Sequence, residues 1–168
     1  MEREKLLNLL KNKIIILDGA MGTQLMEMGF TKGCGEELNI KNPEIVKSVH
    51  KSYADAGCDI IITNTFGANR LKLEQYGLKN KVKEINEAAV KLAREAAPNC
   101  LIAGDIGPLG KYVEPLDSLT FEEAYGLYKE QILALNKSDI LIIETVSDIK
   151  LQVRNLNFPV IASPFFHP

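Results

Sequence analysis

The chain has 168 residues, a net charge of −2, 46% hydrophobic residues and 25% charged residues. This composition suits one globular domain, and the weak charge argues against a nucleic-acid or membrane-surface role driven by bulk charge. No segment approaches the roughly 18 apolar residues of a membrane span. The three cysteines are too few and too scattered for a disulfide framework, which predicts a cytoplasmic location.

The chain alternates short apolar runs with amphipathic segments after a predicted lead-in helix at residues 2–11. The runs are β-branched and almost unbroken, which is typical of parallel strands buried on both faces. Alternation with helical segments predicts βα units and an α/β fold with about five parallel strands. The predicted strands are residues 14–17, 60–63, 101–104, 140–143 and 159–162.

The intervening segments carry helical patterns and recognisable caps. Helices are predicted at residues 42–56, 82–97 and 120–136, with about two turns at 148–155. Asn42 followed by Pro43 predicts a helix start, and Gly57 predicts its end. Thr120 and Glu123 have the spacing of a capping box.

Two long connections, residues 19–42 and 105–119, follow predicted strands, whereas the connections from helix to strand are short. Long loops at the carboxyl ends of parallel strands are where barrels and open α/β sheets build their sites. We therefore expect a site at this side of the sheet.

Polar residues follow the apolar runs at this same side. They are Asp18, Asn64, Thr65, Asp105 and Glu144, with Ser163 as a weaker example. Parallel strands bring their ends together, so three carboxylates at one rim suggest a cation, an ammonium group or proton transfer. Glycines beside them, such as Gly19, would permit close approach of a ligand. The alternative is that strand ends are polar because they meet water.

The cysteines and histidines form no recognisable zinc motif, because no Cys-x-x-Cys or comparable histidine spacing occurs. Cys58 and Cys100 precede strands, on the stability side of a barrel, and are interpreted as small buried residues. Cys34 lies in the first long loop on the site side. His50 falls on a helix and is interpreted as a solvated or packing residue.

Several ordered motifs resemble the homocysteine S-methyltransferase family, and the methionine synthase type most closely. The similarity extends over about residues 10–150. The motifs are Leu17-Asp18-Gly19-Ala20-Met21-Gly22-Thr23, Glu37-Leu38-Asn39 with Asn42-Pro43, residues 56–69 (AGCDIIITNTFGAN), Gly104-Asp105-Ile106-Gly107-Pro108-Leu109-Gly110 and Ile142-Ile143-Glu144-Thr145.

The resemblance implies a (β/α)8 TIM barrel that transfers a methyl group to the thiol of homocysteine, giving methionine. In the full-length family, zinc held by three cysteines activates that thiol, and the donor is methylcobalamin or another compound such as betaine or S-methylmethionine. By motif match, Asp18 and Glu144 would hold the amino group, and Gly19 and Ala20 would offer backbone contacts. Asn64, Thr65, Phe66 and Asp105 complete the expected substrate-binding set.

The family's zinc cysteines follow the sixth and eighth strands, whereas this sequence reaches only about the fifth, so no catalytic or metal residue is identified. We therefore expect residues 1–168 to be the N-terminal, incomplete portion of the domain, with open sheet edges and an uncovered apolar interior. Such a chain would be inactive alone and would need a missing C-terminal half, besides a cobalamin or folate domain. The alternatives are a zinc-free amino-acid-binding module and a non-functional fragment; a phosphate-binding aldolase is disfavoured by the lack of a glycine-rich phosphate loop.

Overall fold

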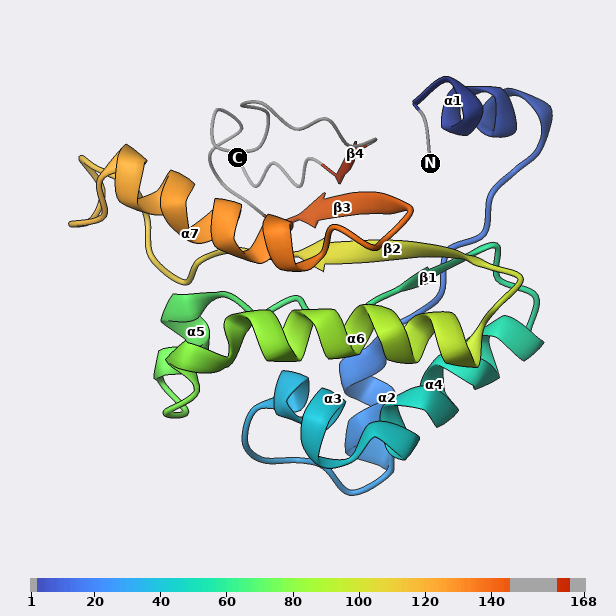
Figure 1. Cartoon of the computed structure of the whole chain (residues 1–168), viewed down its shortest axis with the longest axis horizontal. Helices are drawn as coiled ribbons and strands as arrows, with labels where there is room; N and C mark the ends of the chain where they lie inside the picture. Colours follow the sequence, from blue (N-terminus) through green and yellow to red (C-terminus); the bar gives the residue numbers. More distant parts are fainter. Residues whose placement is uncertain (1–2, 146–159, 164–168) are drawn as a thin grey trace.

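Four of the predicted apolar runs form one parallel sheet (Figure 1). The computed structural model describes residues 3–145 and 160–163. The strands are β1 (Ile60–Ile62), β2 (Leu101–Ile106), β3 (Ile140–Glu144) and β4 (Val160–Ser163), in the spatial order β1-β2-β3-β4. The predicted α/β class and parallel sheet are confirmed, with helices in the connections from β1 to β2 and from β2 to β3.

The first predicted strand, residues 14–17, is present only as a single parallel bridge between Leu17 and Ile60. The backbone N–H of Asp59 donates to the carbonyl of Ile16 at 2.8 Å, so the segment does lie beside β1. Ile14 is 88% exposed. Among the described residues, this segment lies beside β1 alone. Its pairing with β1 does not extend beyond the single bridge.

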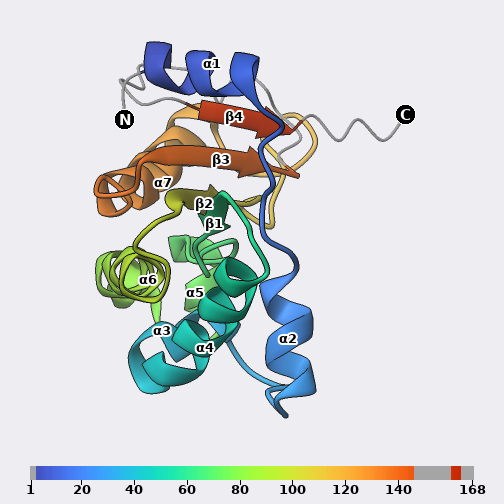
Figure 2. The ribbon, with the colours of Figure 1, turned by 90° about the vertical axis from the view of Figure 1, so that its right-hand side faces the viewer.

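The helices are α1 (Arg3–Asn12), α2 (Met21–Glu27), α3 (Leu38–Lys41), α4 (Pro43–Asp55), α5 (Arg70–Glu74), α6 (Val82–Ala96) and α7 (Phe121–Ala134), with 3₁₀ turns η1 (Gly35–Glu37) and η2 (Lys79–Lys81). The long connection expected at residues 19–42 therefore contains α2, η1 and α3. In Figure 2, α6 and α7 lie on the same side of the sheet, whereas α1 lies apart from them beside β4.

The helix caps follow the sequence with one exception. Thr120 and Glu123 form the predicted capping box, and Gly57 has φ +97°, a conformation that favours glycine after a helix. Pro43 begins α4 as predicted. Asn42 occupies the N-cap position as predicted, but it has φ −136° and ψ 58° and its side chain makes no cap hydrogen bond.

The sheet is buried on both faces. Ile61, Ile102 and Leu141 belong to the larger apolar cluster, to which α6 contributes Val90 and α7 contributes Tyr128. The opposite face carries Ile60, Ala103, Ile140 and Ile142, where Leu6 of α1 packs. All five of these residues are 4% exposed or less. The apolar interior expected to be uncovered is thus buried at these positions, because α1 packs against it.

Two aspartates fix the register at the amino ends of the strands. Asp59, just before β1, accepts the N–H of Ile16 at 3.0 Å through Oδ2. Asp139, just before β3, accepts the N–H of Ile102 at 2.8 Å through Oδ2. Each aspartate therefore bonds the backbone of the preceding strand or strand-like segment, and the arrangement at β1 recurs at β3.

None of the helices in residues 3–145 combines the length and the apolar character that crossing a membrane requires. The helix predicted at 148–155, the tail at 164–168 and His167 lie outside the described residues.

Candidate functional site

Asp18 lies directly after the segment that pairs with β1, and its carboxylate faces that strand. Oδ2 accepts the N–H of Ile62 at 3.0 Å, while the backbone N–H of Asp18 donates to the carbonyl of Ile60 at 3.1 Å. Oδ1 is buried and has no hydrogen-bond partner. Burial raises the pKa of Asp18 to about 7, although the hydrogen bond from Ile62 acts in the opposite direction.

Asp105 is inside β2 rather than beyond its end, and only 4% of it is exposed. Its backbone is held from the β1 side: its N–H donates to Thr63 Oγ1 at 3.0 Å, and its carbonyl accepts Thr65 Oγ1 at 2.8 Å. Its Oδ1 is buried and has no partner. A backbone hydrogen bond from Ile106 reaches this carboxyl group, but Oδ1 itself has neither water nor a donor.

Glu144, the last residue of β3, has the same side-chain direction as Asp105. The register pairs Asp105 with Ile142, and Glu144 follows Ile142 by two residues, so both side chains leave the same face of the sheet. Burial, then the charges of Glu144, Glu36 and Asp18, raise the pKa of Asp105 well above its ordinary value. Asp18 and Glu144, two of the predicted carboxylates, thus lie close enough to Asp105 for their charges to act on it, and so does a further carboxylate, Glu36.

Glu36 was not among the predicted site residues. It lies in η1, and its Oε1 accepts the N–H of Gly67 at 2.7 Å. A methyl group on Gly67 would come within 2.5 Å of that same oxygen, so it would displace the Glu36 side chain from its present position. Glu36, Asp18, Asp105 and Glu144 are called the carboxylate cluster below.

The loop after β1 carries the other predicted residues. Asn64 donates through Nδ2 to the carbonyl of Gly35 at 2.9 Å and to Asn39 Oδ1 at 3.1 Å, so its amide serves the loop structure. Phe66 is half-buried, and Lys72 Nζ lies 4.6 Å from the centre of its ring. A methyl group on Gly107 would come within 2.5 Å of the Phe66 carbonyl oxygen. Phe66 therefore packs directly on the loop after β2.

Beneath the site, buried amides from two helices hold this loop. Gln131 of α7 donates through Nε2 to the carbonyl of Thr65 at 2.8 Å. Asn86 of α6 donates through Nδ2 to the carbonyl of Ala68 at 2.9 Å. Both amides are fully buried. These residues were missed, although each interrupts the apolar side of its helix, a signal that could have identified them.

Gly19 and Ala20 continue the chain from Asp18 and contact α4. A methyl group on Gly19 would lie 2.8 Å from Tyr53 Oη, which donates to the carbonyl of Ala20 at 3.4 Å. Ala20 is the residue before α2 and is exposed. In its present position the Tyr53 ring leaves no room for a methyl group at position 19, so a larger residue there would have to displace the ring.

The cysteines do not fit a zinc site. Cys34 Sγ donates to Glu36 Oε2 at 3.3 Å, and burial together with the charge of Glu36 raises the pKa of its thiol to about 12. Zinc needs thiolates, which positive surroundings favour. Cys58 and Cys100 are partly exposed and lie at the amino ends of the strands, away from Cys34. In the part of the chain that the structure describes, no group of three or more His, Cys, Asp or Glu could hold a metal ion.

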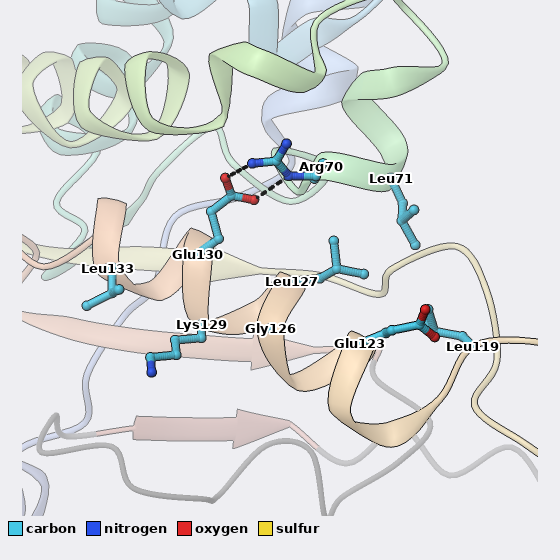
Figure 3. Close-up of a pocket in the computed structure, with 9 residues that line it drawn as sticks. All are labelled: Arg70, Leu71, Leu119, Glu123, Gly126, Leu127, Lys129, Glu130 and Leu133. Carbon is cyan, nitrogen blue, oxygen red and sulfur yellow. Dashed lines mark hydrogen bonds and ion pairs between the residues drawn. The ribbon is translucent and has the colours of Figure 1, made fainter.

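A separate hollow lies on the outer surface between α5 and α7 (Figure 3). It measures about 640 Å³, and the side chains of Leu71, Leu119 and Leu127 line it. Arg70 and Glu130 form an ion pair across its edge. None of the carboxylate cluster lines this hollow, so we distinguish it from the site.

Comparisons with known proteins give one consistent result. The family model for homocysteine S-methyltransferase matches residues 15–156. The methionine synthases of Mycobacterium leprae and Mycobacterium tuberculosis are each 29% identical over 160 residues. The metallated form of the homocysteine methyltransferase MmuM from Escherichia coli is 27% identical, with a TM-score of 0.74. The match covers 86% of this chain, 13% of each synthase and 58% of the MmuM chain.

Proposed function

Because the chain belongs to the homocysteine S-methyltransferase family, we propose that its carboxylate cluster binds the ammonium group of homocysteine for methyl transfer to the thiol. The observation that carries the proposal is the position of Asp18 and Glu144 on either side of Asp105, at the carboxyl ends of parallel strands. An ammonium group has three donors and needs acceptors around it. The unpartnered Oδ1 atoms of Asp18 and Asp105 are such acceptors.

The chemistry of the cluster favours an organic cation over a metal. Glu144, Glu36 and Asp18 each act electrostatically on Asp105, and among the described residues no group of three such side chains is arranged to hold a metal ion. In the proposal, Asp18 and Glu144 accept from the ammonium group. In the same proposal, exposed backbone at Gly19 and Ala20 meets the carboxylate of the amino acid, and the half-buried Phe66 lines the side-chain pocket beside Asn64. Thr65 is fully buried and supports this pocket from behind, through its hydrogen bond to the carbonyl of Asp105.

We assign no residue of this chain to the activation of the homocysteine thiol, because Cys34, Cys58 and Cys100 do not fit a zinc site. A second candidate follows from that same observation: an amino-acid-binding module without methyl transfer. In the enzyme reading, residues 1–168 are one portion of a homocysteine-binding barrel domain, and zinc and the methyl donor are held elsewhere.

Calorimetric titration with L-homocysteine and with 4-mercaptobutyrate tests the proposal. The second compound has the same thiol and carboxylate but no amino group. We expect heat of binding from homocysteine and at least about tenfold weaker binding of the analogue, because the carboxylates then face no cation.

Two variants sharpen the test. Glu144→Gln should weaken homocysteine binding, whereas Asp55→Asn, at an exposed carboxylate of α4, should not. Equal binding of the two compounds would exclude the cluster as an ammonium receptor. Methyl transfer by the chain supplied with zinc and a methyl donor would separate the enzyme from the binding module.

A further inference from the structure

Asp105 is the most enclosed member of the carboxylate cluster. It lies in β2, between β1 and β3, and is 4% exposed, whereas Asp18, Glu36 and Glu144 are each half-buried. Its Oδ1 is buried without a hydrogen-bond donor. Ionising a carboxyl group in such a place costs more than ionising one that water still reaches.

The charges that act most on Asp105 are all negative. They are Glu144 from β3, Glu36 from η1 and Asp18 from the segment before α2. The groups that contact its backbone from β1 and its loop, Thr63 and Thr65, are neutral hydroxyls, and Gln131 from α7 is a neutral amide. A backbone hydrogen bond from Ile106 does favour the ionised form of Asp105, but burial and the charges of Glu144 and Glu36 outweigh it.

We propose that Asp105 carries a proton while the site is empty and releases it when a ligand ammonium group enters the carboxylate cluster. The neutral carboxyl group removes one negative charge from the empty cluster and can donate to a neighbouring carboxylate. When the ammonium arrives, its positive charge replaces that of the proton. The proton then leaves to the solvent, and Asp105 becomes an acceptor for the ligand.

The inference deepens the proposed function, and rests on it for the release step. The protonation of Asp105 in the empty site does not need a ligand. The direction of the pKa shift agrees with it, since burial first and the neighbouring carboxylates second raise the pKa of Asp105. Asp105 acquires a role that differs from simple ammonium binding: it couples ligand affinity to pH.

The ligand-free half of the inference is tested by following the carboxyl ¹³C resonances of the wild-type chain from pH 4 to 8, assigned through the backbone. We expect the Asp105 resonance to keep its protonated position at pH 7. A resonance that titrates below about pH 5, as an ordinary aspartate does, would overturn the inference whether or not the chain binds homocysteine.

The release half is tested by titrating L-homocysteine at pH 7 in two buffers with different heats of ionisation, for the wild-type chain and Asp105→Asn. The wild-type chain should release about one proton more than Asp105→Asn, which keeps the shape of the side chain but has no proton to lose. Comparison of the two chains cancels any proton from the ligand thiol.

Equal proton release by both chains would overturn the coupling. If Asp18→Asn rather than Asp105→Asn abolishes the release, the proton resides on Asp18 and the assignment fails. If homocysteine does not bind at all, the proposed function and the release step fall together, while the resonance of Asp105 still decides whether that residue is protonated.

Discussion

The N–H of Gly67 donates to Glu36 Oε1 at 2.7 Å and joins two loops that are 31 residues apart in sequence. This contact places a fourth carboxylate in the site and fixes the backbone directly after Phe66. A methyl group added at Gly67 would lie 2.5 Å from the accepting oxygen, so the Glu36 side chain would have to move away from this contact.

Glu36→Ala should lower the free energy of unfolding by about 1–2 kcal/mol, because the Gly67 N–H loses a charged acceptor. Urea denaturation measures this. Glu37→Ala is the matched control in the same turn: Glu37 makes only a partly exposed ion pair with Lys41, and its loss should cost about 0.5 kcal/mol or less. Equal losses in the two variants would show that the Glu36 contact does not stabilise the loops.

Gly107→Ala should destabilise the chain by about 1–3 kcal/mol, because the added methyl group would meet the carbonyl oxygen of Phe66 at 2.5 Å. Gly126→Ala is the opposite case. Gly126 is exposed in α7 with no neighbouring atom within 4 Å of an added methyl group, so alanine should stabilise by about 0.5–1 kcal/mol. Thermal unfolding of both variants measures these changes in stability. A Gly107→Ala chain as stable as the wild type would contradict the close contact between Gly107 and the Phe66 carbonyl.

His50 should make the chain less stable in mild acid. It is fully buried in α4, both ring nitrogens lack partners, and burial lowers its pKa to about 4. Because the folded pKa lies below the unfolded value of 6.5, the unfolded chain binds the proton first. Stability is therefore complete above pH 6.5 and falls towards pH 4, by as much as about 3 kcal/mol.

His50→Leu should remove this decline between pH 6.5 and 4, because leucine cannot take up a proton. Urea denaturation at a series of pH values checks the prediction. The same decline in His50→Leu and in the wild-type chain would assign the acid sensitivity to other groups.

Asp18 should have the opposite effect to His50 on the free energy of unfolding: its contribution should decrease as the pH rises from about 4 to 7. Burial raises its pKa from 3.8 to about 7, so the folded chain binds this proton first. The stability that Asp18 contributes is complete below pH 3.8 and is lost as the pH rises through 7. Asp18→Asn should therefore be relatively more stable than the wild type at pH 8 than at pH 4, which paired denaturation curves at the two pH values measure.

Much of the site could be predicted from the sequence because it depends on strand ends. In a parallel sheet, a polar residue after an apolar run reaches the same edge as its counterparts, so Asp18, Asp105 and Glu144 could be grouped without coordinates. The capping box at Thr120 is likewise local, since its two hydrogen bonds join residues three apart.

The remaining features depend on contacts that no local pattern specifies. Glu36 enters the site only because η1 folds against the loop after β1. Gln131 acts on Thr65 from 66 residues away. The segment at 14–17 has the composition of a strand, yet it forms only a bridge. A longer ladder also needs an adjacent strand that offers its hydrogen-bonding groups in register, and the composition of the segment does not determine that.

The aspartates before β1 and β3 have a consequence for how such a chain could arise. Asp59 and Asp139 each anchor the backbone next door through a carboxylate carried at the start of their own strand. The aspartate that sets the register is therefore part of the same βα segment as the strand whose register it sets. A genetic exchange that moved such a βα segment into another barrel would carry its alignment with it, so recombination at these boundaries would preserve strand pairing even where the surrounding sequence differs.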